Sequence, residues 1–422
     1  MSRPTTDHPP LLAIAEQVQD FYDRYPYPPP VESLEQYRRV WQDPQKRRAE
    51  YHLLWPSSPY REDSSLLIAG CGTSQAAKHA LRWPAAQVTA IDISATSVGY
   101  TQELKRKYNL ANLQVHQLSI DRVSELNRNF DQIVCTGVLH HLANPDSGLA
   151  ALRSVLKPDG AMHLMVYAPY GRTGVYMLQE FCRRLGIRAT NEGIGNLITL
   201  LRALPAGHPL ETVLREAPDF QQEAALADAL LHPQDRAYSV PQLFDFIQRG
   251  ALTFGRWVKQ APYSVQCGLI QRLPQALQMA ALSPAEQFAA VELFRGTMVR
   301  HSAIVYRDDG PGPHQSVGFS GETWLNYVPI RMSETICVQE RLPAGAAGVL
   351  INRNHTYTDL LMTIDAAEKL MFDAIDGNRT IGDISETTLP SSRQLDARNF
   401  FERLWWYDQV VFDASRGVQR QR

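Results

Sequence analysis

The chain has 422 residues, of which 44% are hydrophobic and 20% charged, and its formal net charge at pH 7 is -2. This length exceeds one ordinary hydrophobic core and predicts two or three domains. The near-neutral charge gives no sign of the basic face that nucleic-acid-binding proteins carry, and no apolar run approaches the roughly 20 residues that span a bilayer.

The N-terminal residues and the cysteines indicate the compartment. The first 20 residues hold a short apolar patch interrupted by Glu16, which is not a signal-peptide core followed by small residues. The five cysteines are odd in number, scattered and without CxxC spacing. They predict neither a disulfide framework nor a zinc site. We therefore expect a cytoplasmic protein without a membrane segment and without a metal.

Residues 1–60 precede the first strong strand pattern and are predicted to form an N-terminal arm. Within them, the stretch DFYDRYPYPPP clusters tyrosines, among them Tyr25 and Tyr27, ahead of three prolines that stiffen the chain into an extended form. Two interpretations of these tyrosines stay open. They either close over a ligand site or pack the arm onto the next domain.

Strand and helix patterns alternate from residue 64 to residue 168. The apolar, strand-like runs are SLLIAG, QVTAIDIS, LQVHQL, FDQIVCTG and AMHLMVYA. The helical patterns between them cover residues 74–83, 94–110 and 144–157, with Ser94 and Asn144 as N-caps. Continuous apolar runs are typical of parallel strands covered on both faces. The segment is therefore predicted to form an α/β fold with a doubly wound parallel sheet.

The turn after the first strand pattern marks the expected ligand site. Gly70 and Gly72 have no Cβ, so the backbone can bend tightly and approach a ligand. Asp92 ends the second strand pattern, where an acid can accept hydrogen bonds from ribose hydroxyls. A nucleoside-bearing ligand fits this arrangement. The third glycine of a dinucleotide fingerprint falls at Gln75, which disfavours NAD without excluding it.

The segments FDQIVCTGVLHHL and LKPDGAMHLMVYAP resemble class I S-adenosylmethionine-dependent methyltransferases. The resemblance is close over residues 64–168 and weaker as far as Arg307, where residues 238–262 and 298–309 supply the last helix and final strands. It implies a Rossmann-like, seven-stranded methyltransferase sheet over residues 61–170 and 239–309, with S-adenosylmethionine as cofactor.

The resemblance also implies residue roles on the donor side. The glycine turn lines the methionine and ribose, Asp92 binds the ribose, and Ile93 lies against the adenine. The implied cofactor-binding residues are Gly70, Cys71, Gly72, Asp92, Ile93, Ser119, Ile120, Thr136 and Gly137. The chain departs from the family at Ile68, Ser74 and Ser119, which stand where the family has an acid, a glycine and an acid. Other groups, such as those of the N-terminal arm, must therefore hold the amino-acid end of the donor.

Four residues are predicted to act in catalysis. His140 and His141 follow the fourth strand and titrate near neutral pH, so either could be the general base for an acceptor. The alternative is that they cap a helix or pack against the donor. By the same resemblance, Tyr25 and Tyr27 would close the site, exclude water and touch the methyl group.

Two polar-aromatic segments are candidates for the acceptor pocket. Tyr167, Tyr170 and Arg172 follow the fifth strand. His232, Arg236 and Tyr238 lie in LHPQDRAYSVPQL, although this segment is equally explained as a loop before a helix capped by Ser239. An arginine in such a pocket would favour a carboxylate or phosphate on the acceptor.

The remaining segments are predicted from composition. Residues 171–238 are rich in Leu and Ala and predict a helical lid or acceptor insertion. Residues 310–330 begin with Gly, Pro and polar residues and predict a linker. Residues 331–416 suggest a small winged-helix-like domain that weakly resembles PqqD-like domains through DGNRTIGDI. This domain is expected to form a homodimer or to serve a purely structural role, and docking of a partner is the alternative.

The sequence therefore predicts methyl transfer from S-adenosylmethionine to a small molecule or a peptide or protein side chain by direct displacement. Three alternatives stay open: an NAD-dependent oxidoreductase, a non-catalytic interaction protein, and an RNA-modifying enzyme. Salt-dependent RNA binding would mark the last of these.

Overall fold

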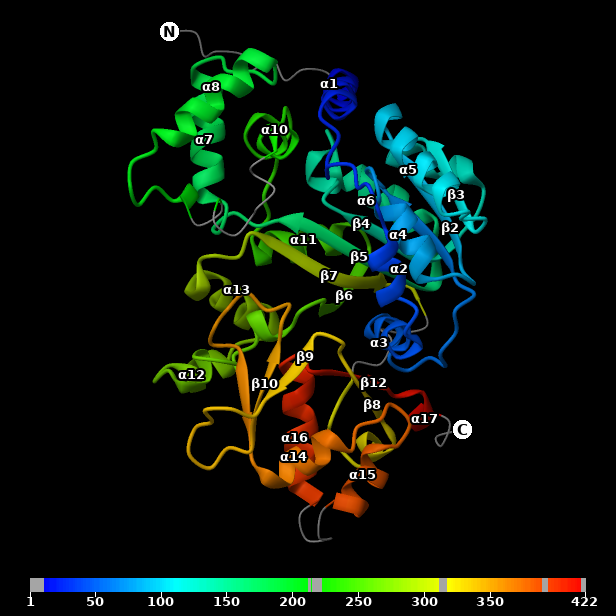
Figure 1. The fold of residues 1–422 in the computed structure, drawn as a ribbon, viewed down its shortest axis with the longest axis vertical. Helices are drawn as coiled ribbons and strands as arrows, with labels where there is room; N and C mark the ends of the chain where they lie inside the picture. The colour runs from blue at the N-terminus through cyan, green and yellow to red at the C-terminus, as the bar shows by residue number, and fades with distance from the viewer. Residues whose placement is uncertain (1–10, 212–213, 215–221, 311–316, 389–393, 419–422) are drawn as a thin grey trace. The chain divides into compact units, whose positions relative to one another are not determined.

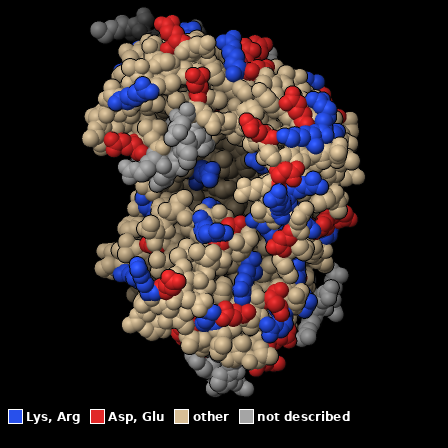
Figure 2. Space-filling view, viewed as in Figure 1, with Lys and Arg blue, Asp and Glu red and all other residues tan. Residues whose placement is uncertain are grey.

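The computed structural model describes residues 11–211, 214, 222–310, 317–388 and 394–418 (Figure 1). The chain divides into two compact units. The first unit comprises Met1–Gln36, Asp63–Ala251 and Arg295–His301, and the second comprises Tyr37–Glu62, Leu252–Phe294 and Ser302–Arg422. No helix among the described residues is long and apolar enough to cross a membrane. Basic and acidic side chains are interspersed over the face shown in Figure 2.

A seven-stranded sheet in the order β3-β2-β1-β4-β5-β7-β6 confirms the predicted α/β class. Its strands are β1 (Ser65–Ala69), β2 (Gln87–Asp92), β3 (Leu113–Gln117), β4 (Phe130–Thr136), β5 (Leu156–Tyr167), β6 (Leu252–Trp257) and β7 (Arg300–Arg307). Strands β1 to β5 pair in parallel, and β6 and β7 pair antiparallel. Leu67 and Ile68 in β1 are fully buried, as expected for a central strand covered on both faces.

Helices connect the parallel strands and carry the predicted caps. They are α4 (Gln75–Arg82), α5 (Ala95–Lys107), the 3-10 helix η1 (Ile120–Leu126), the 3-10 helix η2 (Leu139–His141), α6 (Pro145–Ser154) and α11 (Val240–Arg249). Ser94 accepts a hydrogen bond from the Ser97 amide, and Asn144 accepts one from the Ser147 amide. Helices α4 and α5 pack against β2 and β3 (Figure 1).

One boundary differs from the prediction. Helix α6 ends at Ser154, whereas the predicted helix runs on to Lys157. Strand β5 accordingly begins at Leu156, whose register partner in β4 is Phe130. Pairing with the neighbouring strand thus outweighs the helical pattern here, because differences in helix propensity are small compared with the free energy of tertiary contacts.

The first unit also contains the end of the N-terminal segment and most of the predicted lid. Helix α1 (Leu11–Arg24) packs against α5. The insertion forms α7 (Thr173–Arg184), α8 (Asn191–Arg202) and α10 (Glu223–Leu231), with a small apolar core of its own that includes Val175, Leu197 and Leu210. Residues 212–213 and 215–221 of the predicted lid lie outside the described residues.

The second unit is a mixed helical and β structure. Its N-terminal and central helices are α2 (Glu35–Val40), α3 (Pro44–Leu54), α12 (Ala276–Ala280) and α13 (Pro284–Arg295), with short 3-10 helices at Ala261–Tyr263, Ile270–Arg272 and Thr323–Asn326. Strands β9 (Thr335–Val338), β10 (Gly348–Asn352) and β11 (Leu361–Ile364) form one antiparallel sheet, and β8 (Val328–Arg331) pairs with β12 (Val410–Asp413). The C-terminal helices are α14 (Ala366–Asp373), α15 (Ile381–Thr388), α16 (Gln394–Trp406) and α17 (Ser415–Val418).

The predicted linker is wrong for its described part. Val317, Phe319, Trp324 and Tyr327 are buried in the same core as α14, α15 and α16. The Gly, Pro and polar residues that suggested a linker lie at positions 308–316, before this aromatic stretch. The aromatic rings themselves are buried because removing them from water stabilises the folded state. Residues 311–316 lie outside the described residues.

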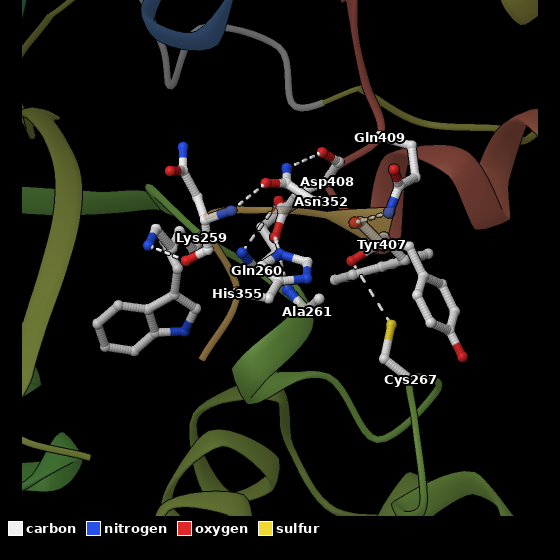
Figure 3. A network of polar contacts seen from close by, with 12 residues as sticks. Lys259, Gln260, Ala261, Cys267, Asn352, His355, Tyr407, Asp408 and Gln409 are labelled. Carbon is white, nitrogen blue, oxygen red and sulfur yellow. Dashed lines mark hydrogen bonds and ion pairs between the residues drawn. The ribbon is translucent and has the colours of Figure 1, made fainter. Parts of the chain in front are cut away.

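Asp408 organises a buried polar network within the second unit (Figure 3). Its backbone lies in the left-handed region with φ +52°. Its carboxylate accepts hydrogen bonds from the amides of Gln260 (3.0 Å) and Ala261 (2.9 Å), and it also contacts His355 (3.1 Å) and Arg256 (3.4 Å). This one carboxylate joins the segment after β6 to the turn before β12.

Candidate active site

The glycine turn after β1 is fixed to the end of β2. The amides of Gly70 and Cys71 donate to the Ile91 carbonyl at 2.9 and 3.0 Å. Gly70 has φ +72° and Gly72 has φ +53°, which is the left-handed region that favours glycine. A Cβ on Gly70 would lie 2.3 Å from a methyl carbon of Val138. Backbone strain and lack of space therefore both require glycine at position 70.

Asp92 ends β2 beside this turn, as predicted. Its carboxylate accepts hydrogen bonds from the Gly72 amide (2.8 Å) and the Ser94 amide (2.9 Å). Burial raises the pKa of Asp92, and these two N–H groups partly oppose the shift. Each carboxylate oxygen keeps acceptor capacity after one backbone contact, so Asp92 can also receive hydroxyl groups of a ligand.

The end of the N-terminal segment lies against the same turn. The Thr73 hydroxyl donates to the Pro28 carbonyl at 2.8 Å. A Cβ on Gly72 would lie 3.2 Å from the Tyr27 carbonyl oxygen. Asp23 accepts hydrogen bonds from the Ser94 hydroxyl, which places residues 23–28 beside the two glycines.

Several other residues predicted to bind the methyl donor have no free polar side chain, so they could contact it only through backbone atoms or a partly exposed surface. The Cys71 side chain is fully buried and points to Thr101 (3.9 Å), and burial raises the pKa of its thiol. Thr136 accepts a hydrogen bond from the Gln75 side chain at 2.7 Å, and Gly137 has φ +79°. Gln75, which occupies the third-glycine position of a dinucleotide fingerprint, thus links the first turn to the end of β4.

The residues expected around an adenine are less enclosed. Ile93 is half-buried, and its carbonyl accepts a hydrogen bond from Gln117. Ser119 precedes η1 and makes no side-chain cap contact there, while Ile120 is buried. None of these contacts contradicts the predicted roles, which stay predictions.

Beyond β4 and β5, buried imidazole and tyrosine rings pack together. We call this group the histidine cluster; it comprises Tyr22, His140, His141, Tyr167, Arg172, Asp228, His232 and Asp235. His141 lies between two other imidazole rings that are tilted relative to it, with ring centroids 4.1 Å from His140 and 4.0 Å from His232. The ring of Tyr167 lies 4.1 Å from that of His140.

The backbone of Gln234 fixes two of these rings in opposite tautomers. Nδ1 of His141 lies 2.8 Å from the Gln234 carbonyl, which can only accept, so this nitrogen carries the hydrogen. Nδ1 of His232 accepts from the Gln234 amide at 3.0 Å. In the neutral rings, Nε2 of His141 therefore has a free lone pair, whereas Nε2 of His232 is an N–H donor.

Two carboxylates and a guanidinium complete the cluster. The guanidinium of Arg172 lies 3.6 Å from the Tyr167 ring centroid and 3.4 Å from an Asp235 oxygen, and Gln179 donates to the same oxygen at 3.0 Å. Asp228 accepts from the Tyr22 hydroxyl at 2.9 Å.

Burial controls the charge states in the cluster. It holds the pKa of His140 and of His232 well below the ordinary range, so both rings are neutral at pH 7. It raises the pKa of Tyr22 and of Tyr167, so both phenols keep their protons. The cluster is therefore a largely neutral, hydrogen-bonding environment around one buried arginine.

The sheet-forming segment matches a known family. Residues 67–162 match the family model described as a methyltransferase domain. The segment is a class I S-adenosylmethionine-dependent methyltransferase domain.

Relatives and one solved structure resemble different parts of the chain. The solved structure of PKMT2 from Rickettsia typhi in complex with AdoHcy has a TM-score of 0.60 and 15% identity, covering 88% of this chain and 75% of that one, and so shows the fold. An uncharacterised protein from Synechococcus sp., syc1184_c, is 35% identical over 252 residues, which are 57% of this chain and 60% of the relative. Malonyl-[acyl-carrier protein] O-methyltransferase from Acetivibrio thermocellus is 28% identical over 120 residues, covering 28% of this chain and 41% of the relative. The chain thus spans about half the length of the curated relatives it matches.

The strand order separates the methyltransferase domain from dinucleotide-binding sheets. The dinucleotide-binding order is 3-2-1-4-5-6 with parallel strands. Here β7 stands between β5 and β6, and it pairs antiparallel with β6. The predicted seven-stranded methyltransferase sheet is confirmed.

The methyltransferase domain brings together only half of the predicted acceptor residues. Tyr167, Arg172 and His232 belong to the histidine cluster. Tyr170 is 42% exposed, Arg236 is exposed, and Tyr238 packs its ring on Phe246 at 5.1 Å.

The predicted closing tyrosines are also separated. The Tyr25 hydroxyl donates to the Ala189 carbonyl (3.3 Å) in the helical insertion, while the backbone of Tyr27 lies at the glycine turn. Tyr22, Asp228 and Gln179 also belong to the site or contact it, although the sequence predicts no role for them. Only the proximity of Tyr22 to the predicted tyrosines was a signal in the sequence.

Proposed function

We propose that this protein transfers the methyl group of S-adenosylmethionine to an acceptor that reaches the histidine cluster. One observation carries the proposal: the glycine turn with Asp92 follows β1 and β2, and the histidine cluster follows β4 and β5. Carboxyl ends of parallel strands meet at one edge of a sheet, so a donor and an acceptor can face each other there.

The residues at the glycine turn fit the donor. Gly70 and Gly72 adopt left-handed backbone and let the turn pack closely against Val138 and the Tyr27–Pro28 backbone, which fixes the shape of the turn beside Asp92. Asp92 has acceptor capacity for ribose hydroxyls, and Gly137 adds no side chain of its own at the end of β4. S-adenosylmethionine, when bound, supplies an electrophilic methyl group for direct displacement. The protein's own contribution is to hold donor and acceptor in line, which supplies much of the acceleration.

On the acceptor side, the cluster supplies positioning, exclusion of water and one available lone pair. Aromatic rings and the helical insertion bury the polar groups, which strengthens every electrostatic contact inside. The lone pair on Nε2 of His141 can take a proton from the acceptor, which is the role predicted from the sequence, or it can bind a cation. The acceptor is a small molecule or a peptide side chain.

Calorimetry with S-adenosylhomocysteine tests the donor site. The wild-type protein should bind it, and Asp92→Ala should weaken binding at least about tenfold, which corresponds to about 1.4 kcal/mol. Asp92→Asn should lie between the two, because its amide keeps one acceptor oxygen. Asp146→Ala, which removes an exposed carboxylate paired with Arg249 (2.9 Å), is the matched control and should bind as the wild type does.

The alternatives give different results in the same experiment. An oxidoreductase would bind NADH more tightly than S-adenosylhomocysteine. A non-catalytic protein with a lost donor site would bind neither compound. Equal affinity in wild-type and Asp92→Ala proteins would remove Asp92 from the site.

A further inference from the structure

We propose that His140, His141 and Asp235 form a binding site for one divalent transition-metal ion. The ligand-type atoms of these three side chains lie within 4.8 Å of one another, as found among the described residues. Two imidazole nitrogens and one carboxylate oxygen are a ligand set that suits Zn²⁺, Co²⁺ or Fe²⁺. The site lies on the acceptor side of the proposed methyl transfer, so its role in catalysis rests on that function.

Buried polar atoms without partners point to a missing ligand here. Oδ1 of Asp235 and both ring nitrogens of His140 have no hydrogen-bond partner in the described part of the chain. His140 is fully buried, and the Asp235 side chain is 2% exposed. Each buried polar group without a partner destabilises the folded state, more so when it is charged, so native proteins rarely leave several together. A cation would satisfy the carboxylate oxygen and one imidazole nitrogen at once.

The surrounding contacts orient the three ligands. The Gln234 carbonyl holds the hydrogen of His141 on Nδ1 and leaves the Nε2 lone pair available. Gln179 and Arg172 contact the other oxygen of Asp235, which leaves Oδ1 as the ligand atom. Outer hydrogen bonds of this kind fix the tautomer and the carboxylate orientation in established metal sites.

A second group of side chains is equally close together, but the tautomer of one of its histidines prevents metal binding. His141, Asp228 and His232 also lie with their ligand-type atoms within 4.8 Å. However, Nδ1 of His232 accepts from the Gln234 amide, so the neutral ring carries its hydrogen on Nε2. That nitrogen has no lone pair for a metal. The Tyr22 hydroxyl already uses one oxygen of Asp228.

With neutral imidazoles, the divalent ion, Arg172 and Asp235 together carry a net charge of +2, which favours an anionic acceptor beside the ion. Asp235 pairs with Arg172 through one oxygen and presents the other to the cation. The remaining ligands are neutral nitrogens, and nitrogen ligands favour transition metals over Mg²⁺ or Ca²⁺, which prefer oxygen.

A cation at this position defines the acceptor class. A hydroxyl oxygen bound to such an ion has a lowered pKa and can release its proton to water before it attacks the methyl carbon. The C–S bond of the donor then breaks and S-adenosylhomocysteine leaves, so the site would favour methylation of oxygen. His141 would then hold the ion and would not act as the base.

Metal titration of the full-length protein tests the site. After EDTA treatment and dialysis, Co²⁺ is added and the visible d–d absorption is followed, with Zn²⁺ binding measured by calorimetry. We expect one equivalent of either metal. Asp235→Asn and His141→Gln should each weaken binding at least about tenfold, and His232→Gln should retain wild-type metal affinity.

Two results would overturn the metal site. One is less than half an equivalent of Zn²⁺ on wild-type protein that still binds S-adenosylhomocysteine; the role of His141 as a base would then stand. The other is a metal affinity that Asp235→Asn leaves unchanged and His232→Gln abolishes. S-adenosylhomocysteine calorimetry on every variant checks folding, and a wild type that binds metal but no S-adenosylhomocysteine would count against the proposed function alone.

Discussion

Replacing Gly70 by alanine tests whether the glycine turn is the donor site. The residue has φ +72°, where alanine is strained, and its new Cβ would lie 2.3 and 2.9 Å from the two methyl carbons of Val138. The turn amide also donates to Ile91, so the backbone cannot move aside without losing that hydrogen bond. Backbone strain at position 70 and steric overlap with Val138 should therefore both destabilise the variant.

The cost follows from two separate contributions. The left-handed backbone costs a non-glycine residue about 1–2 kcal/mol. Forcing one extra carbon into a packed contact adds about 1–3 kcal/mol. Gly70→Ala should therefore lower the free energy of unfolding by about 2–5 kcal/mol. A displaced turn should also weaken S-adenosylhomocysteine binding at least about tenfold.

A double-mutant cycle with Val138→Ala separates the two contributions. Removing both Val138 methyl groups should relieve the overlap and leave only the backbone strain, so the coupling energy should be about 1–3 kcal/mol. Urea unfolding and calorimetry measure it. Gly99→Ala, on α5 with nothing within 4 Å, is the control and should stabilise the protein by about 1 kcal/mol. A coupling energy near zero would refute the packing argument.

Two further predictions concern the second unit. Burial lowers the pKa of His52 to about 4 despite the Asp413 carboxylate 3.6 Å away. Below about pH 6.5 the unfolded state therefore binds more protons than the folded state, and the free energy of unfolding should fall by about 2 kcal/mol between pH 7 and pH 5. Urea unfolding of His52→Gln should show a pH dependence that is smaller by this amount. An unchanged pH dependence in His52→Gln would contradict the argument. Asp408→Asn should lower the free energy of unfolding by about 3–5 kcal/mol, because it leaves the mostly buried guanidinium of Arg256 without its ion-pair partner. The exposed control Asp309→Asn should cost under about 1 kcal/mol, and equal costs for the two variants would show that the Asp408 network contributes little.

Much of the fold was predictable because its signals are local. The runs that became β1 and β4 are mostly apolar, with Asp131 and Gln132 as polar exceptions near the start of β4, and burial on both faces of a parallel sheet favours such runs. Ser94 and Asn144 lie immediately before their helices, so their caps were visible as well. The failures came where packing overrides local pattern. Leu156 joins β5 instead of extending α6. The polar residues before Phe319 led to the prediction of a linker, although the residues from Val317 onward belong to the core.

The glycine turn was predictable from local sequence, whereas the histidine cluster was not. The Gly72 amide and the Asp92 carboxylate are 20 positions apart, one in the turn after β1 and the other at the end of the adjacent parallel strand β2, so one βαβ unit fixes their separation. The histidine cluster joins Tyr22 to Asp228 across 206 positions and His141 to Gln234 across 93. At such separations the chain itself imposes no distance, and the helical insertion decides which side chains meet. A histidine pair is visible in the sequence, but its hydrogen positions depend on a distant carbonyl group, and those positions determine whether the pair binds a proton or a cation.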